Sequence, residues 1–328
     1  MKEEEIRQRT VFNRYLELVT EDVQKIFADR GSFIQINCPA CGGKKHQFQF
    51  EKLGFIYVLC PNCGTLFVNP RPPLKLLMDF YTKSRSAKFW INDFFEPVAE
   101  ARREKIFRPR VEHIMGTLPE LARGTVGDIG AGFGLFLEEL AKIWLSAKLV
   151  AIEPSIEMAE ICRGKGLEVI PCFVEDVQGW DGRFDLLTSF ELFEHLFDPS
   201  EFLKKLRHLL RPGGRLFLTT LNGEGFDIQV LWGKSKSISP PQHLNLFNPR
   251  SISILLKKNG LVVEQVDTPG KLDWDIVEGM YRGEGIDPGR FWKLVAEQAE
   301  PAVKNSLQHW ISSSGLSSHM RILARKIK

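Results

Sequence analysis

The sequence predicts an α/β fold built on a mostly parallel sheet, preceded by a small module held together by cysteines. Short apolar segments alternate with amphipathic ones from about residue 122 to the end of the chain, which is the pattern of strands connected by helices. A glycine-rich turn separates the first of these strands from its helix, and two matched cysteine pairs lie nearer the N-terminus. The residues that bear on function therefore lie in two separate segments, one with the cysteine pairs and one with the glycine-rich turn.

The composition allows one large α/β domain and a smaller module. The chain has 328 residues, of which 43% are hydrophobic, so a sizeable core can form. Its 44 lysines and arginines nearly balance 41 acidic residues, and a near-neutral chain has no strong attraction to nucleic acid or anionic membranes. No apolar run is long enough to span a bilayer, and the charged start MKEEEIRQRT differs from a signal peptide. We therefore expect a cytoplasmic protein without a membrane partner.

Four of the six cysteines form two matched pairs. Cys38-Pro-Ala-Cys41-Gly and Cys60-Pro-Asn-Cys63-Gly are separated by a segment rich in aromatic residues that suits a small hairpin. Paired thiolates at this spacing are typical ligands of tetrahedral zinc, and the glycine after each pair lets the backbone turn towards the sulfurs. A redox pair or disulfides are the competing interpretations. We predict a zinc ribbon whose metal is structural, because four cysteines leave no open coordination position: Cys38, Cys41, Cys60 and Cys63.

The glycine turn follows a predicted strand at residues 126–129 and precedes an amphipathic helix. Glycines at alternate positions let the backbone turn sharply and lie close to a ligand. The next strand, at residues 148–152, ends at Glu153, whose carboxylate can accept hydrogen bonds from ribose hydroxyls. These features predict a nucleoside cofactor held by Glu153 and three glycines: Gly130, Gly132 and Gly134.

The spacing of these glycines argues against a dinucleotide. A dinucleotide-binding turn has the pattern G-x-G-x-x-G, whereas this chain has G-x-G-x-G with Leu135 in the last dinucleotide position. Asp128 lies at the end of the preceding strand. Its carboxylate would repel a pyrophosphate but would suit a cofactor that carries an ammonium group.

The alternation of strands and helices continues after the glycine turn. A strand at 184–190 runs into the sequence ELFEHLFDP. A helix follows, and its start is well marked because Asp198 can cap it and Pro199 suits its first turn. The turn Arg211-Pro-Gly-Gly214 then leads to another strand at 215–220.

This order of motifs, together with the glycine turn, resembles class I S-adenosylmethionine-dependent methyltransferases. The resemblance covers roughly residues 32–328 and is most specific in 125–220. It implies S-adenosylmethionine as methyl donor and a Rossmann-like seven-stranded sheet, mostly parallel with the last strand antiparallel beside the sixth, and with helices on both faces. It also places Glu175 or Asp176 against the adenine amine. The full set of expected cofactor residues is Asp128, Gly130, Gly132, Gly134, Glu153, Glu175, Asp176 and Phe190.

Two histidines are candidates for a catalytic base, which a hydroxyl or a carbon acid would need as methyl acceptor. His195 follows the fourth strand, and His243 lies in the proline-rich loop after the fifth, at the sheet edge where open parallel sheets bind ligands. Glu194 is a third candidate. Structural roles are the alternatives, because His195 can fix the start of a helix and His243 can brace its loop.

The zinc ribbon joined to this domain is similar to nucleotide-sugar C-methyltransferases, which also carry a loop like Ser239-Pro-Pro-Gln-His-Leu-Asn-Leu-Phe247. This resemblance implies a small-molecule methyl acceptor, with a nucleotide-linked sugar as the finer expectation. An RNA methyltransferase whose ribbon holds nucleic acid is the alternative, and the near-neutral charge argues against it. A binding module without catalysis is a third hypothesis.

The expected segments follow from these motifs. The basic run between Arg102 and Arg110 is expected to be a solvated helix face, and the N-terminal helix is expected to pack on the protein or to form an oligomer contact. The segments are an N-terminal helix (1–31), the zinc ribbon (32–70), a helical cap or linker (71–121), and the methyltransferase domain (122–328) with a helical insertion at about 273–314.

Overall fold

The computed structural model of the protein describes residues 2–327, apart from the side chains of residues 92 and 94–96. Contacts divide the chain into two units. The first unit comprises Met1–Ala99, Leu221–Ser251 and Asp267–Met320, and the second comprises Glu100–Thr220, Ile252–Val266 and Arg321–Lys328. These units are not continuous in sequence, whereas the segments expected above were drawn as continuous ranges.

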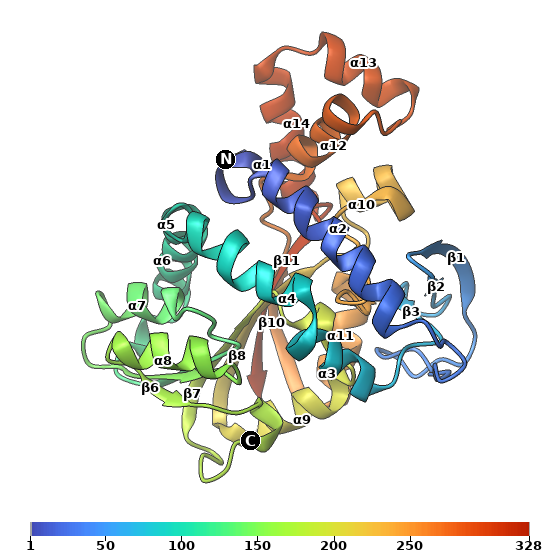
Figure 1. Ribbon diagram of the computed structural model, residues 1–328. Helices are drawn as coiled ribbons and strands as arrows, with labels where there is room; N and C mark the ends of the chain where they lie inside the picture. The colour runs from blue at the N-terminus through green and yellow to red at the C-terminus, as the bar shows by residue number, and fades with distance from the viewer. Residues whose placement is uncertain (1, 328) are drawn as a thin grey trace. The chain divides into compact units, whose positions relative to one another are not determined.

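The second unit is organised around a seven-stranded sheet with the order β10-β11-β8-β7-β4-β5-β6 (Figure 1). The central pairs β4–β5, β4–β7, β5–β6 and β7–β8 are parallel. The last strand in the chain lies beside the sixth, so the predicted fold class is confirmed. The strands are β4 (Thr125–Ile129), β5 (Lys148–Ile152), β6 (Glu168–Ile170), β7 (Phe184–Phe190), β8 (Leu210–Leu221), β10 (Leu261–Asp267) and β11 (His319–Lys326).

Helices bury apolar side chains against this sheet. Residues of α6 (Arg108–Thr117), α7 (Leu135–Ala141) and α8 (Ile156–Gly164) form one core with residues of β4, β5 and β7. The helices α9 (Pro199–Leu209) and α11 (Pro249–Lys258) bury a further set of leucine, isoleucine and phenylalanine side chains. Burial of this kind stabilises a fold by about 25 cal/mol for each Å² of apolar surface removed from water.

The start of α9 confirms the capping signal in the sequence. The Asp198 carboxylate accepts hydrogen bonds from the backbone N–H groups of Ser200 and Glu201, at 2.9 and 3.1 Å, and Pro199 occupies the first turn. Such a cap satisfies two backbone donors that have no partner within the helix, and its loss typically costs about 1 kcal/mol. The cap fixes where the chain turns after the sequence ELFEHLF.

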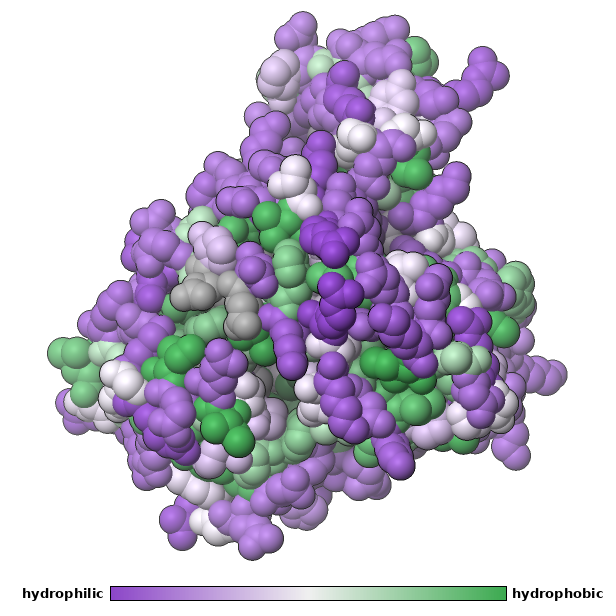
Figure 2. Space-filling model, in the orientation of Figure 1, coloured by the Kyte–Doolittle hydropathy of each residue, from purple (hydrophilic) through white to green (hydrophobic). Residues whose placement is uncertain are grey.

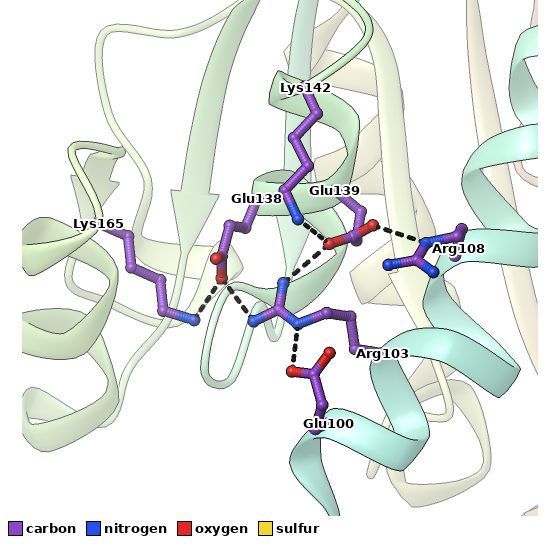
Figure 3. A network of polar contacts seen from close by, with 7 residues as sticks. All are labelled: Glu100, Arg103, Arg108, Glu138, Glu139, Lys142 and Lys165. Carbon is purple, nitrogen blue, oxygen red and sulfur yellow. Dashed lines mark hydrogen bonds and ion pairs between the residues drawn. The ribbon is translucent and has the colours of Figure 1, made fainter.

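A network of ion pairs joins the segment before α6 to α7 (Figure 3). Arg103, in the π-helical turn η3 (Arg103–Phe107), donates hydrogen bonds to Glu138 and Glu139 of α7, each at 3.0 Å. Glu139 is buried and also accepts from Arg108 and Lys142. Burial by itself would raise the pKa of Glu139, but these three donors outweigh it and lower the pKa to about 2. The network holds α6 and α7 together.

The first unit contains a four-stranded sheet, order β1-β2-β3-β9. β1 (Gln47–Lys52) and β2 (Phe55–Leu59) form an antiparallel hairpin between the two cysteine pairs, as the sequence predicts. β3 (Leu66–Val68) pairs with β2, and the two-residue strand β9 (Asn245–Leu246) pairs with β3. The loop after β8 therefore extends the sheet of the cysteine module.

The remaining elements of the first unit are helices. None of the helices within residues 2–327 combines the length and apolarity needed to cross a bilayer. On the face drawn in Figure 2, hydrophilic residues predominate and hydrophobic ones are scattered among them, as is usual for a folded surface. The helices are α1 (Glu3–Ile6), α2 (Arg9–Ile26), α3 (Leu74–Lys83), α4 (Arg85–Phe89), the π-helical η1 (Trp90–Phe95), α10 (Phe226–Leu231), α12 (Asp273–Glu284), α13 (Arg290–Gln298) and α14 (Pro301–Ser313).

Three of these helices form the segment before the last strand. α12, α13 and α14 lie together in Figure 1, in orange and red, and they share an apolar core with α10. Trp274 of α12, Trp292 of α13 and Phe226 of α10 contact one another, with ring centroids 4.8 to 6.4 Å apart. The aromatic contacts explain why this segment is helical and packed rather than an open loop.

Candidate cofactor site and metal centre

The glycine turn adopts the backbone conformation that its sequence suggests. Gly130, Gly132 and Gly134 have φ angles of 68°, 55° and 69°, a region that residues with a side chain rarely occupy. A methyl group built on Gly132 would meet nothing within 4 Å, whereas one built on Gly134 would lie 3.0 Å from the Cys162 sulfur. Gly132 therefore borders open space that a ligand can enter, and Gly134 allows close packing of α7 against α8.

Glu153 fixes the shape of this turn. Its carboxylate is 5% exposed and accepts hydrogen bonds from the backbone N–H groups of Gly132, at 2.8 Å, and Ser155, at 2.9 Å. Burial raises the pKa of Glu153 above its ordinary value. Each oxygen of a carboxylate has a second lone pair, so Glu153 can hold the turn and still accept a hydrogen bond from a ribose hydroxyl.

Asp128 is a buried carboxylate at the carboxyl end of the central strand. It is 2% exposed, and its Oδ1 accepts a hydrogen bond from the Thr188 hydroxyl at 2.6 Å. Burial raises its pKa to about 7, although the hydrogen bond from Thr188 and the charge of Arg110 act in the opposite direction. A positively charged group beside Asp128 would favour its ionised form, which is the chemistry that an ammonium-bearing ligand offers.

The sequence interpretation was wrong about Arg110, which is not on a solvated face. Its side chain is 12% exposed, and its Nη2 donates a hydrogen bond to Glu191 Oε1 at 2.7 Å. The guanidinium lies 4.6 Å from the centre of the Phe190 ring, which places Phe190 beneath it. Glu191 directly follows β7, has the unusual φ of 50°, and also accepts from the Thr219 hydroxyl at 2.7 Å. A strained residue of this kind is common at functional sites.

The predicted adenine residues lie on one short turn. Glu175 and Asp176 are exposed and belong to the 3₁₀ turn Val174–Asp176, which follows β6. Two exposed apolar side chains that the sequence analysis missed flank the same strand ends: Ile156 begins α8 after β5, and Phe173 precedes Glu175. Exposed apolar groups beside polar ones suit the face and the edge of a purine base.

Two of the three candidates for a catalytic base, Glu194 and His195, are consecutive in the sequence. Glu194 is 2% exposed, and its Oε2 accepts a hydrogen bond from the Thr220 hydroxyl at 2.8 Å. Burial, reinforced by the nearby charge of Glu191, raises the pKa of Glu194 to about 8. His195 follows it in the turn Phe193–His195, with Nε2 4.0 Å from Glu194 Oε1.

His243 belongs to the first unit, and backbone atoms hold it there. Its Nδ1 lies 2.7 Å from the carbonyl oxygen of Ser237, and its own carbonyl oxygen accepts a hydrogen bond from the Tyr57 hydroxyl at 2.8 Å. These contacts fit the bracing role as well as the catalytic one, because a ring fixed through one nitrogen can still use the other in proton transfer.

The four paired cysteines converge in the first unit. The sulfur of Cys38 lies 3.5 Å from that of Cys63, and the sulfur of Cys41 lies 3.6 Å from that of Cys60. All four sulfurs lie within 4.8 Å of one another. Bonds of about 2.3 Å to a tetrahedral zinc ion would place sulfurs roughly 3.8 Å apart, so the set fits such an ion. All six cysteines are free thiols in the structure.

The two cysteine pairs share one backbone geometry. Gly42 and Gly64, which follow the pairs, have φ angles of 78° and 74°, and each donates its N–H at 2.9 Å to the first cysteine carbonyl of its pair. The hydrogen bond from Cys38 is the main cause that lowers the pKa of Cys63, to about 4. A thiolate is the form that binds metal. Cys63 favours that form, whereas the hydrogen bond with Cys63 raises the pKa of Cys38 and burial raises the pKa of Cys41. The geometry of the four sulfurs is therefore what favours a metal centre.

Comparisons with known proteins identify a methyltransferase domain in the chain. The model of a family described as "Methyltransferase domain" matches residues 99–266. A ubiquinone biosynthesis O-methyltransferase of Xanthomonas euvesicatoria is 31% identical over 170 residues, which are 48% of this chain and 70% of the relative. The corresponding protein of Xanthomonas oryzae is 36% identical over 120 residues, or 34% of this chain, and the match spans about half (49%) of that relative.

A solved structure supports the fold. A chain from the complex between the Haloferax volcanii Trm112 methyltransferase activator and a methyltransferase superposes with a TM-score of 0.50. The match has 16% sequence identity and covers 70% of this chain and 92% of that chain. At this identity the likeness concerns the arrangement of strands and helices alone.

Proposed function

The chain belongs to the methyltransferase domain family and is an S-adenosylmethionine-dependent methyltransferase, and on that premise we propose that it methylates a small molecule. The observation that carries the proposal is the arrangement at the carboxyl ends of β4 and β5. A buried Asp128, a glycine turn with open space at Gly132, and a Glu153 that holds this turn occur together there.

We assign the parts of the cofactor to residues of the second unit. Glu153 would accept hydrogen bonds from the ribose hydroxyls, and Asp128 would pair with the ammonium group. Ile156 and Phe173 would contact the faces of the adenine ring, with Glu175 or Asp176 at its amine. Arg110 would pair with the carboxylate, because a guanidinium prefers a planar anion and this one is buried among acidic residues.

The residues of the chain would then have to orient the acceptor and remove its proton. When bound, S-adenosylmethionine supplies a methyl group on a positively charged sulfur, which is already activated for transfer. In-line positioning gives most of the rate, and a base is required if the acceptor is a hydroxyl or a carbon acid. We propose His195 or His243 as that base, with Glu194 as the third candidate. The raised pKa of Glu194 leaves it mostly protonated at neutral pH.

The acceptor itself is a finer proposal. The names of the matched relatives favour a hydroxyl on a ring like that of a ubiquinone precursor. The cysteine module resembles the ribbon of sugar C-methyltransferases and so favours a nucleotide-linked sugar. RNA is the alternative acceptor, and a net charge of +3 gives it little support.

We also propose that the cysteine cluster holds one structural zinc ion. Four sulfurs at tetrahedral spacing leave no position for a substrate. The metal would fix the ends of the hairpin β1–β2, since the two cysteine pairs flank it.

An acceptor screen with radiolabelled S-adenosylmethionine tests the proposed function. Label should pass to catechols or to nucleotide sugars and leave RNA unlabelled. Transfer to RNA with a steep dependence on salt would instead favour the alternative. Binding of the cofactor without transfer to any of the three classes would favour a non-catalytic binding module.

A further inference from the structure

The sulfur of Cys162 lies against the glycine turn of the second unit, and none of the roles proposed above uses it. Cys162 belongs to α8 and is fully buried, in the same apolar core as residues of α6 and α7. Its Sγ donates a hydrogen bond to the carbonyl oxygen of Gly132 at 3.2 Å. A methyl group built on Gly134 would lie 3.0 Å from the same sulfur. Cys162 is therefore a neighbour of two of the three glycines in the turn.

The three glycines are held in different ways. The N–H of Gly130 donates to the carbonyl oxygen of Ile152, and that of Gly134 donates to the carbonyl oxygen of Ala131, each at 2.9 Å. These two bonds involve the backbone alone and do not depend on side-chain identity. The middle glycine, Gly132, is instead bonded to side chains.

Both backbone polar groups of Gly132 have a side-chain partner. The Glu153 carboxylate accepts a hydrogen bond from its N–H at 2.8 Å, and the Cys162 thiol donates one to its carbonyl oxygen. These two groups belong to the peptide planes on either side of its Cα. An unrestrained glycine has more backbone freedom than any other residue, so the two side chains together fix the turn at a position where φ is 55°.

The surroundings of Cys162 keep it in the protonated form that can donate. Burial, and then the charge of Glu153, raise the pKa of Cys162 to about 11. At neutral pH the sulfur therefore carries its proton, and the Gly132 carbonyl is an acceptor for it. A buried thiol of this kind is also a poor nucleophile, which favours a structural use of the proton over a chemical one.

We propose that Cys162 is a positioning residue for the cofactor, whose thiol holds the Gly132 carbonyl so that the glycine turn has its binding shape before S-adenosylmethionine binds. This inference rests on the proposed function. None of the described atoms would lie within 4 Å of a methyl group built on Gly132, so the turn is open towards a ligand while its polar groups are held by Cys162 and Glu153. A turn ordered in advance loses less conformational freedom on binding, which strengthens affinity.

The variants Cys162→Ala and Cys162→Ser separate this hydrogen bond from packing. Both have a smaller side chain than cysteine, but only serine keeps a donor. Calorimetric titration should show S-adenosylmethionine binding at least about threefold weaker in Cys162→Ala and within about twofold of the wild type in Cys162→Ser. Serine should be no more stable than alanine to heat, because a buried hydroxyl is costly. The order of the affinities should therefore differ from the order of the stabilities.

Amide hydrogen exchange without the cofactor gives a second readout. Residues 130–134 should exchange faster in Cys162→Ala than in the wild type, and Cys162→Ser should resemble the wild type. Wild-type affinity and exchange in Cys162→Ala, or equal losses in the two variants, would overturn the inference. Failure of the wild type to bind S-adenosylmethionine would instead refute the proposed function, while the exchange comparison would still decide whether Cys162 holds the turn.

Discussion

Arg110 Nη2 lies 2.7 Å from Glu191 Oε1, and this pair joins α6 to the residue that follows β7. The charges of Asp128 and Glu194 also act on Arg110. One buried guanidinium therefore balances acidic groups contributed by two neighbouring strands. Such a cation is well placed to hold a carboxylate ligand while it keeps the acidic residues in position.

The first prediction concerns this arginine. Arg110→Lys keeps the charge but loses the planar fork, so it should raise the dissociation constant of S-adenosylmethionine at least about tenfold. Titration calorimetry measures the change. Arg163→Lys, on the exposed pair with Glu160 in α8, is the control and should bind as the wild type does. Wild-type affinity in Arg110→Lys would remove Arg110 from the proposed site.

The second prediction concerns the glycine turn. Gly132→Val should abolish cofactor binding, because φ is 55° at this position and the added side chain would occupy the open space beside the turn. Gly166→Val is matched to it: φ is 78°, a methyl group would also meet nothing within 4 Å, and the residue lies at the end of α8. The control should lose stability but retain affinity. Equal loss of binding in both variants would attribute the effect to general strain.

The third prediction concerns the cysteine cluster. Protein expressed with ample metal should contain about one zinc per chain, and Cys60→Ser should lose the metal and unfold the hairpin β1–β2. Metal binding supplies on the order of 10 kcal/mol of folding free energy in small zinc domains. Elemental analysis and amide hydrogen exchange give the two readouts. Cys172→Ser, outside the cluster, should keep its zinc, and an absence of zinc from the wild type would exclude the metal centre.

The fourth prediction concerns the catalytic base. His195→Ala or His243→Ala should lower turnover at least about a hundredfold, with cofactor affinity nearly unchanged. The measurement requires the acceptor identified by the screen described above. Near wild-type turnover in both variants would mean that positioning alone supplies the rate.

The fifth prediction uses the raised pKa of Glu194. Its ordinary value is 4.5 and its folded value is about 8, so the folded state keeps a proton that the unfolded state releases over this interval. The contribution to stability is therefore present below about pH 4.5 and is lost as the pH rises towards 8. Urea unfolding should show Glu194→Gln gaining stability relative to the wild type between pH 5 and pH 8. A pH-independent difference between the two would show that Glu194 titrates normally.

The candidate site could be predicted from the sequence where the local pattern of strands also fixes which residues meet in the folded protein. The strand ends at Asp128 and Glu153 could be predicted, because neighbouring parallel strands bring their carboxyl ends to one edge of the sheet. Arg110 could not. The run between Arg102 and Arg110 was assigned to a solvated face because it is basic, and the groups that Arg110 contacts, Glu191 and the Phe190 ring, lie far along the chain.

Long-range pairing was equally hidden. β9 is two residues long and joins the sheet of the cysteine module from more than 170 residues away in sequence, where Leu66 pairs with Leu246. Its two residues read as part of a loop, because a segment of two residues shows no hydrophobic period. The grouping of residues 221–251 with the N-terminal unit therefore had no local signal.

Titration of the wild-type protein with S-adenosylmethionine and with NAD, followed in the same calorimeter, distinguishes the two kinds of cofactor site. One S-adenosylmethionine should bind per chain with micromolar affinity, and NAD should give no heat of binding, because Asp128 and the spacing of the glycine turn exclude a pyrophosphate. Saturable binding of NAD, or no binding of S-adenosylmethionine to folded protein, would contradict this prediction.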